Sequence, residues 1–330
     1  MTNKDYNISD VNDIHGESKN DKLHKMSEAI KAEARRLGFF SCGIAKAEPV
    51  EGEERETYLK RVDKHCFADM DYMYRNVEKR LDPTLLVPGT KSIISVAMNY
   101  APSASQKEDC YKFAAYALGH DYHIVIKERL RTLASTFQWD KENCRVFVDT
   151  APVLERYWAM RAGLGWIGKN DLLIIPHAGT MFFLGEIFVD IELEYDKPIE
   201  SRCGRCHRCI DNCPTHALST NPFDAQLCLS YQLIENRGEL SEGAKKAMGD
   251  TIYGCDRCQQ SCPWNRFSTP TTEPEFQPNE ELLDMRKNDW LNLDVEKYRK
   301  LFKGSAVKRA KYSGLMRNIE AASENEDTSL

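Results

Sequence analysis

The chain has 330 residues, which is enough for more than one domain and for a substantial buried core. Its formal net charge of −6 gives no general attraction for nucleic acid, and no apolar run approaches the roughly 20 residues that cross a membrane. Because the amino-terminal end also lacks the apolar segment of a signal peptide, we expect a soluble, cytoplasmic monomer with no membrane partner.

The first part of the chain predicts alternating helices and strands. Residues 1–25 are rich in Asp, Asn, Lys and Ser and predict a flexible leader, and the core domain is expected over 26–198. Its first helix, marked by Met26, Ile30, Ala34 and Leu37, should end at Gly38. Strands are expected over 39–45, 92–97, 146–148, 172–175 and 181–193, and helices over 122–137 and 153–162. This alternation favours an α/β sheet covered by helices, with the last two strands forming a hairpin.

Asp149 is the acid that stands out in this domain. It follows a predicted strand and precedes a predicted helix, which is where open α/β sheets place ligands. The alternative is a helix N-cap, since Pro152 would suit the first turn. From spacing alone the cap is favoured.

Three glycines, Gly163, Gly165 and Gly168, match the dinucleotide-binding pattern Gly-x-Gly-x-x-Gly. That pattern belongs between a strand and a helix, whereas here it follows a helix and precedes a strand. We therefore exclude a nicotinamide dinucleotide site. The glycines should form tight turns or let the backbone approach a large flat ligand.

The most informative feature is the cysteine run at 203–214. It has the form Cys-x2-Cys-x2-Cys-x3-Cys-Pro, in which the fourth cysteine ligates the other cluster of a two-cluster ferredoxin. A second run, at 255–263, is one ligand short because Ile252 stands where a cysteine would fall, and Cys228 is the candidate to complete it. The predicted ligands are Cys203, Cys206, Cys209 and Cys262 for one [4Fe-4S] cluster and Cys213, Cys228, Cys255 and Cys258 for the other.

Zinc is the main alternative for these cysteines. Paired Cys-x2-Cys units also bind zinc, but a zinc site needs four thiolates and leaves the third and fourth cysteines of the first run unexplained. The proline after each run also fits the ferredoxin pattern better. We expect two clusters in a module over 199–268, and free thiols at the scattered Cys42, Cys66, Cys110 and Cys144.

Residues 269–330 predict a helical segment with a basic patch and an acidic, frayed tail. The basic patch contains five basic residues and no acidic one: Lys303, Lys308, Arg309, Lys311 and Arg317. Such a patch can contact phosphates whatever the overall charge. A solvated helix face explains the pattern equally well.

Taken together, these motifs resemble the epoxyqueuosine reductases, which are cobalamin-dependent iron–sulfur enzymes of tRNA modification. The likeness covers roughly residues 25 to 318, and the pairing of Asp149-Thr-Ala-Pro152 with the Cys262-Pro-Trp-Asn265 ending makes it narrow. Matching stretches lie in order at 116–123, 148–156, 161–170, 182–186, 203–214, 228–231 and 253–265.

The resemblance implies a cobalamin-binding α/β core of the reductive-dehalogenase type, a two-[4Fe-4S] bacterial-ferredoxin-like module and a short helical carboxyl-terminal end. The implied reaction is reduction of epoxyqueuosine to queuosine at the wobble position of tRNA, the last step of queuosine biosynthesis. Electrons would come from a low-potential donor of the flavodoxin or ferredoxin type and pass through the clusters to cobalamin. Asp149 matches the family's proton donor, which displaces the N-cap interpretation, and Arg75, Lys169 and Ser230 match positions near the cobalamin or substrate.

Cobalamin itself does not follow from the residues alone, since the Asp-x-His-x-x-Gly signature of histidine-ligated cobalt is absent; the family binds cobalamin without such a histidine. Longer family members also carry a carboxyl-terminal helical-repeat extension that has no counterpart here, so we expect the basic patch and the cluster module to grip the tRNA. Two other functions stay open: a reductive-dehalogenase-like reductase acting on a small molecule, and an electron-transfer protein without cobalamin.

Overall fold

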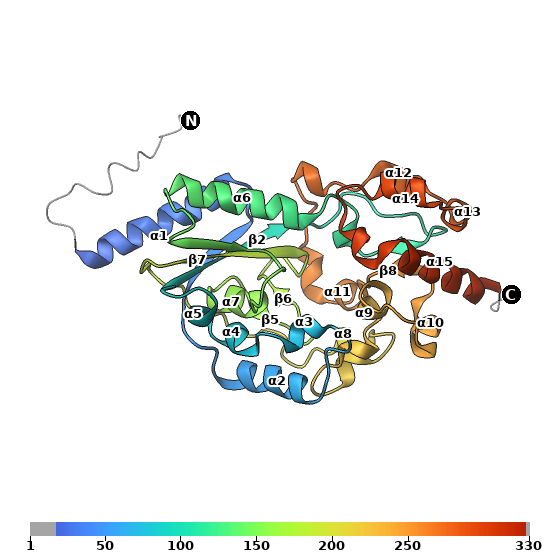
Figure 1. Cartoon of the computed structure of the whole chain (residues 1–330), viewed down its shortest axis with the longest axis horizontal. Helices are drawn as coiled ribbons and strands as arrows, with labels where there is room; N and C mark the ends of the chain where they lie inside the picture. Colours follow the sequence, from blue (N-terminus) through green and yellow to red (C-terminus); the bar gives the residue numbers. More distant parts are fainter. Residues whose placement is uncertain (1–17, 328–330) are drawn as a thin grey trace.

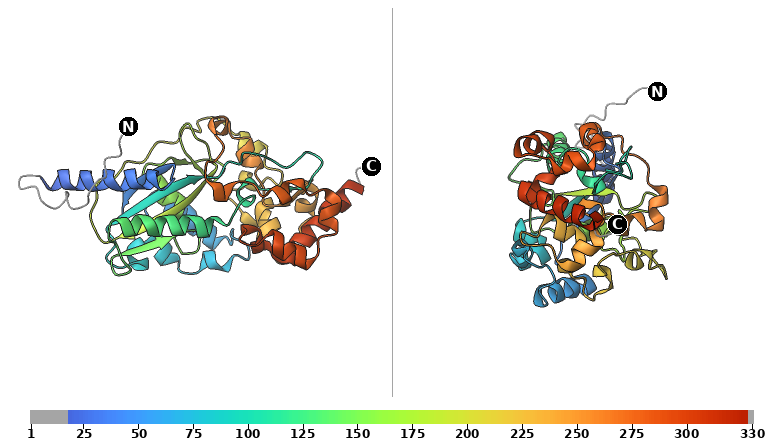
Figure 2. Two further views of the ribbon diagram at one scale, coloured as in Figure 1. Left: turned by 90° about the horizontal axis from the view of Figure 1, so that it is seen from above. Right: turned by 90° about the vertical axis from the view of Figure 1, so that its right-hand side faces the viewer.

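The computed structural model describes residues 18–327; the earlier part of the predicted leader lies outside these residues. Figure 1 shows an elongated molecule with a sheet-containing lobe at one end and a helical lobe at the other. Figure 2 shows the first and last helices, α1 (Lys19–Arg36) and α15 (Lys311–Asp327), at opposite ends of the long axis. No helix within 18–327 is long and apolar enough to span a bilayer.

The core lobe contains a four-stranded sheet with strand order β1-β2-β7-β4. Helices α1 and α6 lie on one face, and α7 lies with shorter helices on the other (Figure 1). The strands are β1 (Ser41–Lys46), β2 (Ser92–Asn99), β4 (Cys144–Phe147) and β7 (Phe182–Val189), and the helices are α2 (Gly52–Asp63), α3 (Asp71–Tyr74), α4 (Val77–Leu81), α5 (Pro83–Leu86), α6 (Tyr122–Thr136) and α7 (Glu155–Arg161). The mixed α/β class predicted from the sequence is confirmed.

Two details of the predicted core are wrong. Every pairing in the main sheet is antiparallel, so the rule that places ligands at one edge of an open α/β sheet does not explain the position of Asp149. The predicted hairpin of the last two strands does not form either: β6 (Leu173–Ile174) pairs with β5 (Trp166–Ile167), while β7 joins the main sheet. Gly165 permits the first of these pairings, because a Cβ there would lie 2.1 Å from the carbonyl oxygen of Ile174.

Helix α1 begins inside the segment predicted as a leader. Ser18 accepts the amide of Asp21 at 3.2 Å, and the Asp21 side chain accepts from the Ser18 backbone, which forms a capping box. The helix then buries Ile30 and Ala34 against the sheet and ends before Gly38, whose φ of 91° suits a glycine. Residues 19–25 are therefore helical rather than flexible.

The predicted cluster module consists of short elements joined by loops. A short parallel pairing ties it to the core lobe: β8 (Thr251–Tyr253) pairs with β3 (Lys112–Phe113), which precedes the 3-10 helix η2 (Ala115–Ala117). Its other elements are α8 (Arg208–Asp211), η3 (Ala217–Ser219), η4 (Ala225–Leu227), α9 (Leu229–Ile234), α10 (Glu242–Met248), α11 (Arg257–Gln260) and η5 (Pro263–Phe267).

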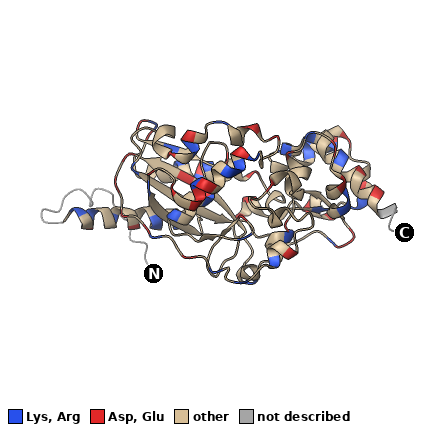
Figure 3. Cartoon of the chain, turned by 90° about the horizontal axis from the view of Figure 1, so that it is seen from below, with Lys and Arg blue, Asp and Glu red and all other residues tan. Residues whose placement is uncertain are grey.

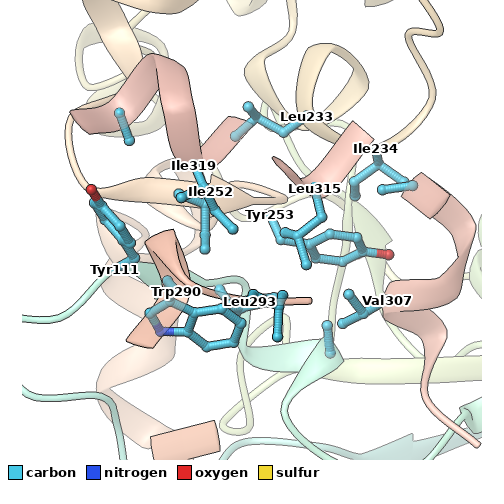
Figure 4. Close-up of a cluster of buried hydrophobic side chains, with 14 of the residues drawn as sticks. Tyr111, Leu233, Ile234, Ile252, Tyr253, Trp290, Leu293, Val307, Leu315 and Ile319 are labelled. Atoms are coloured by element: carbon cyan, nitrogen blue, oxygen red, sulfur yellow. The ribbon is translucent and has the colours of Figure 1, made fainter. Parts of the chain in front are cut away.

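The carboxyl-terminal helices pack on this module and share one hydrophobic core with it (Figure 4). Ile252, which stands where a cysteine is missing from the second run, is fully buried in that core beside Leu233 and Ile319. The helices are η6 (Pro274–Phe276), α12 (Glu280–Asp284), α13 (Lys287–Leu291), α14 (Val295–Leu301), η7 (Ala306–Ala310) and α15. Since α15 carries Glu320 and Glu324, the acidic end is helical to Asp327 rather than frayed.

Candidate active site

Asp149 lies in the loop just after β4. Its backbone has φ of 51°, a left-handed conformation that few residues other than glycine adopt, and its side chain is 57% exposed. Helix α7 begins only at Glu155, after Leu154, and no side chain caps it. The N-cap interpretation of Asp149 is therefore wrong, and its conformation has to be explained by its contacts.

Two side chains from the first turn of α6 hold the Asp149 carboxylate. The Tyr122 hydroxyl donates a hydrogen bond to it, and Nε2 of His123 lies 3.5 Å from Oδ2. The other ring nitrogen of His123 contacts Asp121, the N-cap of α6, at 2.7 Å. The Tyr122 ring stacks on Phe183 of β7, with 4.3 Å between ring centroids. The start of α6 thus positions both partners of the acid.

The charges around Asp149 favour this arrangement. Burial opposes a charged His123, but its contacts with Asp121 and Asp149 outweigh it and raise the pKa of His123 to about 9, so the ring is cationic at neutral pH. Burial, reinforced by the nearby carboxylates, raises the pKa of Tyr122 far above its ordinary value. The tyrosine therefore keeps its proton and remains a hydrogen-bond donor.

The Asp149 backbone is held from the other side by a glutamate. Its N–H donates to the carboxyl of Glu155, the first residue of α7. Glu155 in turn lies beside the carboxyl of Glu186 on β7, which has no exposed surface. Burial and then the charge of Asp149 raise the pKa of Glu155 to about 8, and burial and then Glu155 raise the pKa of Glu186 well above its usual range.

Sequence reasoning assigned no role to four residues of this site, although all of them lie in stretches that carry the resemblance: Tyr122, His123, Glu155 and Glu186. Glu186 could have been identified from the sequence, since it is the one acidic residue in the apolar strand Phe-Phe-Leu-Gly-Glu-Ile-Phe-Val. A charged residue at a buried strand position is rare unless it has a partner or a role.

The first group of cysteines lines a cavity of about 80 Å³, together with Pro263 and Trp264. The indole N–H of Trp166, a residue that is 1% exposed, points at Sγ of Cys203 over 3.4 Å. An N–H aimed at sulfur suits a thiolate that carries charge in a metal cluster. The cysteines that line this cavity are Cys203, Cys206, Cys209 and Cys262.

The other three cysteines of the two runs, Cys213, Cys255 and Cys258, are joined by Cys228 in a second group. Burial raises the pKa of Cys258, and the charges of Cys255, Cys228, Asp256 and Cys213 raise it further, so the four thiols lie within electrostatic range of one another. The backbone N–H groups of residues 230 and 231 point at the Cys228 sulfur. The two groups have the same members as the two ligand sets predicted from the spacing. Within residues 18–327 no three His, Cys, Asp or Glu side chains converge on one metal-ion position.

The three weaker site candidates make contacts of other kinds. Lys169 donates to the backbone carbonyls of Gly204 and Cys206 at 2.8 and 3.0 Å, so it braces the first cysteine loop. Ser230 is on α9 next to Cys228. Arg75 is exposed and pairs with Asp71 at 3.2 Å. The structure groups Lys169 and Ser230 with the cysteines.

The basic patch is only partly available to a ligand. Arg309 makes two hydrogen bonds of 2.7 Å to Glu235, and Arg317 donates to backbone carbonyls that include those of residues 232 and 236, both at 3.0 Å. Lys303, Lys308 and Lys311 are exposed. Figure 3 shows basic positions interspersed with acidic ones over these helices.

An exposed tyrosine connects the basic patch to the Asp149 site. Tyr72 is 46% exposed, and the Arg309 guanidinium lies over its ring, 5.7 Å from the centroid. Burial of the hydroxyl, with the charges of Glu235 and Asp149 also contributing, raises the pKa of Tyr72 to about 12. Tyr72 is therefore within electrostatic range of both the patch and the acid.

Comparison with known proteins gives a consistent result. The family model "Epoxyqueuosine reductase QueG, DUF1730" matches residues 80–150, and the model "4Fe-4S double cluster binding domain" matches residues 202–265. A curated epoxyqueuosine reductase from Cellulophaga algicola is 45% identical over 300 residues, which cover 90% of this chain and 97% of the relative.

Solved structures agree with the sequence relatives. A crystal structure of epoxyqueuosine reductase with an epoxyqueuosine-modified tRNA-Tyr stem loop matches with a TM-score of 0.83 and 27% identity, covering 91% of this chain and 81% of that one. A Bacillus subtilis epoxyqueuosine reductase, solved with its aspartate-bearing catalytic loop swung out of the active site, matches with a TM-score of 0.81 and 26% identity, covering 91% and 81%.

Proposed function

The chain belongs to the epoxyqueuosine reductase family, and from this premise we propose that it reduces epoxyqueuosine to queuosine in tRNA. The observation that carries the proposal is the presence, in one chain, of an exposed acid held by Tyr122 and His123 and of two groups of four cysteines. The acid can supply a proton to a substrate, and the cysteine groups suit clusters that transfer electrons. An electron-transfer protein alone would not need the Asp149 site.

We propose that the two cysteine groups hold two [4Fe-4S] clusters. The group of Cys203, Cys206, Cys209 and Cys262 suits this role because the thiols line a cavity instead of meeting at one point, and because Trp166 offers an N–H to one of them. Lys169 and Ser230 would then help to hold the loops that carry the cluster ligands. Arg75 remains a candidate contact for cobalamin or substrate.

Cobalamin suits the Asp149 site in two respects. Both ring nitrogens of His123 are engaged by carboxylates, so this histidine is not offered as a ligand to cobalt, in keeping with a cobalamin bound without one. The Asp149 side chain and Tyr72 are exposed, which leaves their outer surfaces free for a large ligand. When bound, cobalamin and the clusters supply the electrons that no side chain can provide.

The protein's own part in the reaction is the handling of protons. Reduction of an epoxide to an alkene takes up two electrons and two protons and releases water. Asp149 delivers one proton to the departing oxygen, and the second proton of the released water comes from the solvent that reaches this exposed side chain. The carboxylate that remains on Asp149 is stabilised by the Tyr122 hydroxyl and the cationic His123. These two residues also orient the acid, because each approaches the same carboxylate from the rigid first turn of α6.

The tRNA contacts are proposed on the side of the carboxyl-terminal helices. Lys303, Lys308 and Lys311 can meet phosphates, and the exposed ring of Tyr72 can stack on a base of the anticodon loop. Arg309 would position that ring. This differs from the sequence-based expectation, in which all five basic residues were available.

The electron donor is proposed to dock on the first cysteine loop. Arg202, Arg205 and Arg208 alternate with the cysteines there and are exposed, although the chain as a whole is acidic. They complement an acidic low-potential donor of the flavodoxin or ferredoxin type. We propose that the enzyme works as a monomer, because all the site groups come from one chain, and in the cytoplasm, where its tRNA substrate is found.

The test is turnover by the reconstituted holoenzyme. The protein is loaded with iron, sulfide and cobalamin and incubated with epoxyqueuosine-containing tRNA and a strong reductant. The tRNA is then digested, and its nucleosides are identified by liquid chromatography and mass spectrometry. Conversion to queuosine supports the proposal. If the absorption spectrum shows both cofactors but the amount of epoxyqueuosine in the tRNA does not fall, the proposal is contradicted and a small-molecule substrate is favoured.

A further inference from the structure

Glu186 is a buried acid whose carboxyl oxygens have no hydrogen-bond partner. The residue has no exposed surface, and neither Oε1 nor Oε2 is hydrogen-bonded within residues 18–327. Burial of a carboxylate without a partner is costly, and native proteins seldom leave such a group unsatisfied. Because no solvent reaches Glu186, its role has to involve the buried groups around it.

The sheet places Glu186 opposite α7. It lies across from Ser95 of β2 and from Phe147 of β4 in the antiparallel ladders, so these three side chains share one face. Ser95 is buried as well, and its hydroxyl also has no partner. The ionisable group that acts most strongly on Glu186 is the carboxyl of Glu155, at the start of α7.

A shared proton explains this pair. Two ionised carboxylates can only accept hydrogen bonds, so nothing links them, whereas a proton on either one makes it a donor to the other. Burial raises the pKa of both carboxyls, and the charge of Glu155 raises that of Glu186 further, so a protonated form is favoured. Like charges at close range rarely ionise together, and the proton then belongs to the pair.

The pair is connected to the Asp149 loop through the backbone. Glu155 accepts the N–H of Asp149, the residue with the left-handed φ of 51°. Aspartate tolerates this conformation better than most residues other than glycine, but it is still uncommon and is supported here by hydrogen bonds. The hydrogen bond to Glu155 supports it on one side of the loop, as the Tyr122 and His123 contacts do on the other.

We propose that Glu155 and Glu186 form a proton-sharing carboxyl clamp that holds the Asp149 loop in its working position. Glu155 fixes the loop backbone, and Glu186 fixes Glu155 through the shared proton. Both are positioning residues that do not touch the substrate. The importance of the clamp for turnover rests on the proposed role of Asp149, but the clamp is itself a property of the fold. In the structure of the Bacillus subtilis relative the aspartate-bearing catalytic loop is swung out of the active site. A loop of this kind can therefore take more than one position, and the clamp would select one of them.

The surroundings of the clamp determine how it loses its protons. Asp149 disfavours ionisation of Glu155, while His123 on α6 and Arg156 on α7 favour it. From the strands beside β7 the facing side chains are Ser95 and Phe147, which do not titrate. Burial raises the pKa of Glu155 to about 8, and the charge of Glu155 adds to burial in raising the pKa of Glu186, so Glu155 ionises first and Glu186 keeps the proton that it donates to Glu155. The clamp should therefore persist as the pH rises through 8.

Hydrogen–deuterium exchange of residues 148–154 tests the clamp without turnover. Glu186→Gln keeps a donor, because its amide N–H can bond Glu155, whereas Glu186→Leu removes it. We expect exchange in this segment to be faster by roughly tenfold or more in Glu186→Leu and close to wild type in Glu186→Gln at pH 7. In the wild type, exchange corrected for its intrinsic rate should not accelerate as the pH rises through 8, because Glu186 still donates its proton to Glu155. Glu128→Gln, the same change at an exposed position on α6, is the control.

The clamp is overturned if Glu186→Leu protects residues 148–154 as well as the wild type, or if Glu186→Gln loosens them equally. It is also overturned if exchange accelerates throughout the core lobe, since Glu186 would then stabilise the sheet in general. Should Glu186→Leu fail to fold, Glu155→Ala removes the acceptor of the Asp149 N–H at a half-buried position and is expected to give the same local acceleration.

Turnover by the holoenzymes gives a second measurement. Glu186→Leu should lower kcat with little change in the KM for tRNA, and Glu186→Gln should restore most of kcat at pH 7. If the wild-type holoenzyme does not convert epoxyqueuosine, the proposed function fails, while the exchange experiment still decides whether the clamp exists.

Discussion

The Asp149 site and the cysteine module are built in opposite ways. In the module most cysteines follow one another with two or three residues between them, so short loops bring together three ligands of the first set and the Cys255–Cys258 pair of the second. At the Asp149 site the contributing groups come from α6, the loop after β4, α7 and β7. Local spacing therefore encodes the electron-transfer part of the molecule, and strand pairing encodes the acid part. Changes in the module should be decisive at single residues, whereas changes around Asp149 should be graded.

The largest effect is expected at Cys228, the one proposed ligand that lies outside both runs. Cys228→Ser should remove one cluster, lower the iron content from about eight to about four atoms per chain and abolish turnover. Iron analysis and electron paramagnetic resonance measure this directly. Cys110→Ser, at a buried free thiol outside both groups, is the control. An unchanged iron content in Cys228→Ser would remove this residue from the ligand set.

Substitution of Asp149 should reduce turnover nearly as much as substitution of Cys228, but without loss of a cofactor. Asp149→Asn keeps the shape of the side chain and its contact with Tyr122, yet it cannot deliver a proton. We expect kcat to fall by roughly a hundred- to ten-thousandfold while both cofactors and the tRNA still bind. Single-turnover assays with cofactor spectra recorded on the same sample separate these effects. Wild-type rates in the variant would assign the proton to another group.

The contrast between the two regions also explains what the sequence could predict. The grouping of the cysteines follows from spacing because Cys203, Cys206 and Cys209 are joined by short loops. The partners of Asp149 could not be predicted this way, since they come from α6, α7 and β7, and no local pattern defines how these elements pack or the register that places Glu186 opposite Phe147.

Long-range contacts account for the other differences. Arg317 looked available in the sequence because its acceptors are backbone carbonyls of residues far away in the chain. Helix α1 was missed at its start because it is polar until Met26, and the capping box at Ser18 is what defines its first turn. The mixed α/β class and the positions of the main strands needed only periodicity.

A smaller effect is expected from the hydrogen bond to Cys203, because it should change the reduction potential of one cluster and not that of the other. Trp166 donates an N–H to the sulfur of Cys203, and hydrogen bonds to cluster sulfurs raise the reduction potential. Trp166→Phe should therefore shift the midpoint potential of the first cluster to a more negative value and leave the second unchanged, as measured by potentiometric electron paramagnetic resonance. Trp264→Phe changes a neighbouring ring of the same size and should cause little shift. Equal shifts of both clusters would argue against a specific hydrogen bond.

The smallest effect is expected at the basic patch, which borders the Asp149 region through Tyr72. If Lys308 neutralises one phosphate, Lys308→Ala should weaken tRNA binding modestly and reduce the slope of log affinity against log salt concentration by about 0.7 to 0.9. Lys22→Ala removes the same charge from the exposed face of α1, at the far end of the molecule, and should leave the slope unchanged (Figure 2). A slope that falls equally in both variants would show that tRNA responds to net charge alone. A fall only in Lys308→Ala would place the tRNA on the carboxyl-terminal helices, next to the acid and apart from the loop where the electron donor is proposed to dock.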